Sequence, residues 1–126
     1  MKIAERWNRG VLVLGIEGDL VGEEETKRLR DIVASRIAGG ERRIILDLEK
    51  VVRIDSAGIG EIVGCYVSIV RAGGQFRLLN PAKRVLEMLV TTRLEPALGG
   101  AFNDETEAVK SFGKEVSCPP PPPAAA

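Results

Sequence analysis

The feature that most constrains the fold is a regular alternation between short apolar runs and helical apolar patterns. Residues 43–48 form a β-branched, largely apolar run, which is typical of a strand covered on both faces. The next apolar residues recur every three or four positions, as on one face of a helix: Ile59, Ile62, Val63, Tyr66, Val67 and Val70. Repeated strand–helix–strand units of this kind predict a largely parallel sheet with right-handed crossovers.

Extending the same pattern to the whole chain predicts the order ββαβαβα(β)α. Strands are expected at residues 3–7, 11–16, 43–48 and 75–79, and the first two should pair as a hairpin. Helices are expected at residues 23–37, from Ser56 to Gly73, from Pro81 and after Asp104, with a last short strand around Ala97 and Leu98. The predicted fold class is therefore α/β, with a small mixed, largely parallel sheet of four to five strands and four helices.

The end of the chain differs in composition from the rest. Five consecutive prolines (119–123) precede three alanines, and such a run suits polyproline II rather than a helix or a central strand. We expect the domain to span residues 1–116 and a Pro/Ala-rich flexible tail to span residues 117–126. Cys65 falls in an apolar helical pattern and Cys118 in the tail, so no disulfide is expected. The sequence shows no targeting segment and no apolar run of membrane length, which predicts a cytoplasmic protein without membrane insertion.

The ionisable residues argue against several classes of function. The chain has 126 residues, of which 18 are basic and 18 acidic, and it has no histidine. A net charge of zero removes the basic field that nucleic-acid binding usually needs. The absence of histidine removes the commonest general base and the commonest metal ligand. We therefore expect neither an enzyme nor a metal site, and no cofactor.

One segment carries chemistry, the sequence Asp55-Ser56-Ala57-Gly58-Ile59-Gly60 at the start of a predicted helix. Ser56 should lie at or near the N-cap, where a serine oxygen accepts a backbone N–H bond. Capping does not explain Gly58 and Gly60, because glycine costs about 1 kcal/mol in a helix relative to alanine. Either another segment or a partner molecule should approach the backbone there.

Two chemical roles for Ser56 can be compared. Phosphorylation would add about −1.5 to −2 charge at a helix N-terminus, beside the charge of Asp55, and so create a binding switch. A nucleophilic role lacks a base, since there is no histidine and no lysine is evidently placed beside Ser56. The residues therefore favour phosphorylation of Ser56 over a small hydrolase that uses Ser56 as its nucleophile.

These residues resemble the STAS domain (sulfate transporter and anti-sigma factor antagonist), in particular its small stand-alone bacterial anti-sigma factor antagonists. Residues 55–60 are similar to the family signature D-S-[SA]-G-[LI]-G. Gly18-Asp19-Leu20 resembles the family's turn before the first helix, and residues 44–48 resemble the strand before the signature. Gly73-Gly74 and residues 80–86 resemble the segments that lead to the third helix. The similarity covers residues 2–112.

The resemblance implies a compact βα superhelix and a protein-binding switch. In such proteins the unphosphorylated domain binds an anti-sigma factor serine kinase and so releases a sigma factor. The kinase then phosphorylates the signature serine, and a PP2C-type phosphatase removes the phosphate. By this resemblance Ser56 is the phosphorylation site, and the kinase-facing surface includes Asp19, Asp55, Ala57, Gly58, Ile59 and Gly60.

One position departs from the pattern of the family. Val21 stands where these antagonists commonly carry an acidic residue, and Glu23, Glu24 and Glu25 could substitute for it. The alternative function is a STAS scaffold or a regulatory subunit of a signalling assembly or a membrane transporter, not switched at Ser56. The apolar faces show no surplus stripe, so a monomer or a weak dimer is expected.

Overall fold

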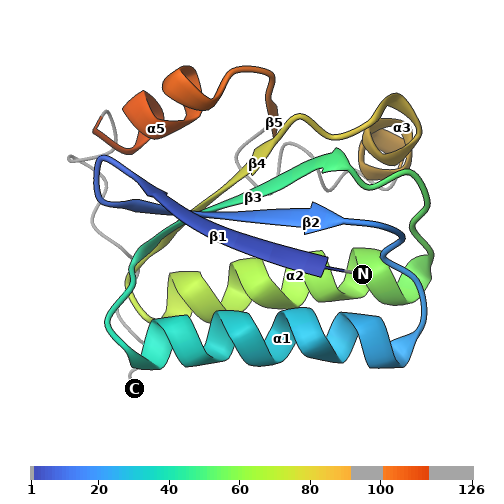
Figure 1. Cartoon of the computed structure of the whole chain (residues 1–126), viewed down its shortest axis with the longest axis horizontal. Helices are drawn as coiled ribbons and strands as arrows, with labels where there is room; N and C mark the ends of the chain where they lie inside the picture. The colour runs from blue at the N-terminus through green and yellow to red at the C-terminus, as the bar shows by residue number, and fades with distance from the viewer. Residues whose placement is uncertain (1, 92–100, 114–126) are drawn as a thin grey trace.

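A five-stranded sheet organises the chain in a computed structural model that describes residues 2–91 and 101–113. The strands lie in the order β1 (Lys2–Asn8), β2 (Val11–Glu17), β3 (Arg43–Lys50), β4 (Gln75–Leu79) and β5 (Ala101–Phe102). The β1–β2 hairpin is antiparallel and every later pair is parallel. The predicted mixed, largely parallel sheet and its opening hairpin are confirmed (Figure 1).

Helices cover both faces of this sheet (Figure 1). They are α1 (Glu23–Ala38), α2 (Ser56–Arg71), α3 (Lys83–Thr91) and α5 (Glu105–Gly113). On one face the larger core packs α1 and α2 against alternate residues of the strands, such as Leu14, Leu46 and Phe76. Within the described ranges, no helix combines the length and the apolar character needed to cross a membrane.

The opposite face carries a smaller core beneath α5. It consists of Val11, Val13, Ile45, Leu79, Ala108 and Phe112. Ile45 therefore points to α5 while its neighbours Ile44 and Leu46 point to α1 and α2, which is why residues 44–46 are all apolar. The guanidinium carbon of Arg77 lies 4.9 Å from the ring centre of Phe112 and extends this core.

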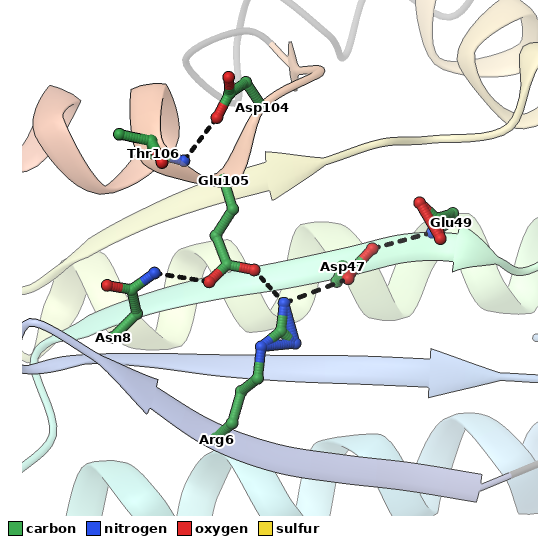
Figure 2. A network of polar contacts seen from close by, with 7 residues as sticks. All are labelled: Arg6, Asn8, Asp47, Glu49, Asp104, Glu105 and Thr106. Atoms are coloured by element: carbon green, nitrogen blue, oxygen red, sulfur yellow. Dashed lines mark hydrogen bonds and ion pairs between the residues drawn. The ribbon is translucent and has the colours of Figure 1, made fainter.

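A polar network joins the first strand to the last helix (Figure 2). Arg6 of β1 pairs with Glu105 at the start of α5, and its Nη2 lies 3.7 Å from Oδ2 of Asp47 on β3. Asn8 donates a second hydrogen bond to Glu105, with 2.6 Å between Nδ2 and Oε2. Asp104 accepts a bond from the N–H of Thr106 at 2.7 Å and so caps the start of α5.

The predicted order of elements is confirmed wherever the structure describes the chain. The strand predicted around Ala97 and Leu98 lies outside the described residues, and the fifth strand that the structure describes is Ala101–Phe102. Trp7 is on the edge strand β1 and is 54% exposed, with its indole N–H donating to Glu41. The domain boundary at residue 116 also falls beyond the described ranges.

Truncating Phe112 should detach α5 from the sheet. We expect Phe112→Ala to lower the free energy of unfolding by about 3 kcal/mol, because it removes a buried ring and leaves a cavity. Val67→Ala is the control, since Val67 is 39% exposed and should cost less than about 0.5 kcal/mol. Urea denaturation of both variants measures the difference, and equal losses would contradict the packing described for α5.

Candidate functional site

The candidate site lies where two neighbouring parallel strands end. The segments that follow β2 and β3 stay side by side, and the N–H of Gly18 donates to the carbonyl of Lys50 at 3.3 Å. The N–H of Leu20 donates to the carbonyl of Arg53 at 2.9 Å, and Leu20 forms an isolated parallel bridge with Ile54. This pairing brings residues 18–22, which precede α1, against residues 51–55, which precede α2.

Asp55 is the N-cap of α2, and its carboxylate binds two different loops. Oδ1 accepts a hydrogen bond from the N–H of Gly58, and Oδ2 accepts one from the N–H of Gly22, both at 3.0 Å. The prediction that Ser56 supplies the capping oxygen is therefore corrected: Ser56 is the first helical residue and Asp55 the cap. Aspartate and serine are equally good caps, so their order in the sequence could not decide between them.

The environment of Asp55 keeps its carboxyl group ionised. The N–H groups of Gly58 and Gly22 stabilise the carboxylate and hold the pKa of Asp55 below its usual value. Ser56 follows directly and is exposed. A fixed negative charge thus stands immediately before an accessible hydroxyl at a helix N-terminus.

Gly58 is required by the contact between the two loops. A Cβ atom there would lie 2.6 Å from Cγ1 of Ile54 and closer still to the carbonyl oxygen of Leu20. The predicted close approach to Gly58 is therefore made by another segment of the same chain. Gly60 is different, because it is exposed and no atom lies within 4 Å of the position of its missing Cβ. The fold itself gives no reason for a glycine at that position.

The other predicted site residues divide by burial. Asp19 and Ala57 are partly exposed, whereas Ile59 is buried in the larger core. Ser56, Asp19, Ala57 and Gly60 therefore reach the surface at one end of α2 and its neighbouring loop, and Gly58 and Ile59 support that surface from below. The contact of each with a partner stays a prediction.

A groove between α1 and α2 continues from this surface, and pattern analysis did not single it out. It is lined by Glu23, Thr26, Lys27, Arg30, Ala57, Gly60, Glu61, Gly64 and Ser68. Glu61 is only 5% exposed and is held by Arg30, with 2.8 Å between Nη2 and Oε1. Cys65 donates to the other oxygen of Glu61, with 3.7 Å between Sγ and Oε2, and burial raises the pKa of this thiol. An acidic residue inside an apolar helical stripe was the available signal, but its partner lies 31 residues earlier in the chain.

Metal binding has no candidate in the part of the chain that the structure describes. There, no three or more Asp, Glu or Cys side chains cluster in a way that could hold an ion.

The family is shown by direct comparison: the sequence model of the STAS domain matches residues 2–108, so the chain belongs to the STAS domain family. A solved structure assigned as an anti-sigma factor antagonist from Thermotoga maritima is 26% identical, with a TM-score of 0.79 over 86% of this chain and 92% of that one. No curated protein sequence matches the chain.

Two further solved structures share the fold at lower identity. Unphosphorylated SpoIIAA, an anti-sigma factor antagonist, is 23% identical with a TM-score of 0.75 over 90% of this chain and 97% of that one. The phosphorylated form of SpoIIAA, a Bacillus cell fate determinant, is 22% identical with a TM-score of 0.70 over 88% of this chain and 99% of that one.

The two glycines of the signature should respond oppositely to alanine. Gly58→Ala should lower the free energy of unfolding by roughly 2–3 kcal/mol, because its methyl group meets the backbone of Leu20. Gly60→Ala should raise it by up to about 1 kcal/mol, because alanine favours the helix and meets no atom. Chemical denaturation measures both variants, and a destabilised Gly60→Ala protein would contradict the open space described there.

Acid should weaken the loop contact made by Asp55. The pKa of Asp55 in the folded protein is lowered below its value of about 3.9 in the unfolded chain. The ionised carboxylate therefore contributes its full stabilisation above about pH 3.9, and this stabilisation is lost as the pH falls through the pKa of the folded protein. The difference in unfolding free energy between wild type and Asp55→Ala should therefore shrink at acid pH. An NMR titration of the Asp55 carboxyl carbon should give a midpoint below about 3.9, and a midpoint above it would refute the assignment.

Proposed function

We propose that the chain is an anti-sigma factor antagonist, a protein-binding domain switched by phosphorylation of Ser56. In its unphosphorylated form it binds an anti-sigma factor serine kinase in the cytoplasm and so releases a sigma factor. A PP2C-type phosphatase restores this form. The observation that carries the proposal is the exposed Ser56 hydroxyl at the first position of α2, beside an ionised N-cap.

The local charge supports a switch at this position. The first turn of α1 carries Glu23, Glu24 and Glu25, and the link from Asp55 to Gly22 places this turn beside the start of α2. A phosphate on Ser56 would add about −1.5 to −2 charge next to Asp55. Since the whole chain has zero net charge, this phosphate would leave the chain with a net charge of about −1.5 to −2, concentrated at the start of α2.

The bonding of Asp55 argues against a catalytic Ser56. A serine nucleophile needs a base that can take the proton of its hydroxyl. The carboxylate of the neighbouring Asp55 binds the backbone N–H groups of Gly22 and Gly58, its lowered pKa makes it a weak base, and the chain has no histidine. These observations favour a hydroxyl that accepts a phosphate in a partner's active site over one that attacks a substrate of its own.

Gly60 supports a closely approaching partner. It stands in the interior of α2, exposed, where glycine costs about 1 kcal/mol and no contact within the fold requires it. A partner backbone can pack against this bare position, one turn from Ser56. The gain in stability expected for Gly60→Ala would then come with weaker binding.

Phosphorylation is tested with an anti-sigma factor serine kinase from the same genome, ATP and magnesium. We expect the wild-type chain to take up one phosphate, found at Ser56 by mass spectrometry, and Ser56→Ala to take up none. Ser68→Ala is the matched control, because Ser68 is an exposed serine further along α2 and its removal should leave the modification intact. A phosphate that stays in the Ser56→Ala protein would refute the proposed site.

Binding of the same kinase separates the switch from a scaffold. Ser56→Ala should bind like the unphosphorylated wild type, and Ser56→Asp should bind at least tenfold more weakly by isothermal titration calorimetry. A STAS scaffold or regulatory subunit would instead bind its partner equally well with either residue at position 56.

A further inference from the structure

We propose that Asp55 is a positioning residue that holds the two loops of the site in one arrangement, so that Ser56 and residues 18–22 are presented to the kinase together. The part that concerns the kinase rests on the proposed function. Asp55 acts here through the backbone of its own chain rather than through direct contact with the partner.

The geometry places one carboxylate between two helix N-termini. Oδ1 of Asp55 lies 3.0 Å from the backbone nitrogen of Gly58, in the first turn of α2. Oδ2 lies 3.0 Å from the nitrogen of Gly22, which is the N-cap residue of α1. Gly22 has no side chain with which to cap its own helix, so Asp55 fixes the point where α1 begins.

Capping alone does not explain why this residue is aspartate. Asparagine and serine cap a helix as well as aspartate does, because each offers one oxygen to a backbone N–H. Two N–H donors approaching from different loops need two acceptor oxygens. In asparagine one of the two positions is an NH₂ group, which is itself a donor and cannot accept from an N–H. The bond to Gly22 is therefore specific to a carboxylate.

The hydrogen bond between Asp55 and Gly22 lies at the outer end of the contact between the two loops, beyond the pairing of Leu20. Pairing of Leu20 with Arg53 and Ile54 and its packing against Gly58 fix the inner part of residues 18–22. Beyond Leu20, the link to Asp55 holds Gly22, which is exposed. Losing this bond should leave the core intact and free the outer half of the loop. That half joins Leu20 to the acidic first turn of α1.

The substitution Asp55→Asn tests the bond directly, because it keeps one capping oxygen. We expect the Gly22 amide proton to move upfield and to exchange with solvent at least threefold faster in NMR measurements, while the Gly58 amide stays protected. Asp104→Asn is the matched control, since Asp104 caps α5 with a single bond to Thr106. Its Thr106 amide should stay protected and its Gly22 amide unchanged. Equal signals for Gly22 in wild type and Asp55→Asn would overturn the proposal, and so would equal loss of protection at Gly22 and Gly58.

The kinase reaction then tests presentation. With the unphosphorylated chain as substrate, Asp55→Asn should raise KM about tenfold and leave kcat unchanged. The substitution disorders the outer part of residues 18–22, which the kinase recognises, but it leaves the hydroxyl of Ser56 in its place at the start of α2. Asp104→Asn should leave both constants unchanged. An unchanged KM in Asp55→Asn, with the Gly22 bond lost, overturns the positioning role. A wild-type chain that takes no phosphate overturns the proposed function and the kinase part of this proposal, while the Gly22 signals still decide whether Asp55 joins the loops.

Discussion

The approach of Gly58 to the backbone of Leu20 is the contact on which the site depends. Without a side chain at position 58, the start of α2 can lie directly on the loop that follows β2. The bridge between Leu20 and Ile54 extends the parallel pairing of β2 and β3 to this point. Gly58 and the neighbouring Ile59, which lies in the larger core, hold the start of α2 below the exposed Ser56, so fold and site share this contact.

The elements that could be predicted from the sequence are those with a regular pattern of apolar residues over several positions. Residues 44–46 face two cores in turn and are all apolar, which makes a central strand easy to identify. The two-residue strand β5 has no such pattern, and the sequence did not single out Ala101 and Phe102. A strand so short is defined by its partner, since Leu78 and Leu79 pair with Ala101 and Phe102.

The site was predicted in outline but not in its internal bonding. The signature located Ser56, yet it could not tell which of the two neighbouring polar residues caps α2. Nor could it separate Gly58, which is needed by Leu20, from Gly60, which faces open space. The pairing of Arg30 with Glu61 shows the same limit, because the two residues meet only when α1 and α2 pack side by side. Local patterns report burial and caps, whereas these distinctions come from contacts between segments distant in the chain.

The link between Arg6 and Glu105 has a consequence for the order in which the protein is made. Its partners are 99 positions apart, so β1 cannot acquire it until nearly the whole domain has been synthesised. The loops and helices around Ser56 come from residues 18–71, which emerge from the ribosome well before α5. Because chains are synthesised at about 5–20 residues per second, the surface around Ser56 has a few seconds in which to form before the opposite face of the sheet is covered.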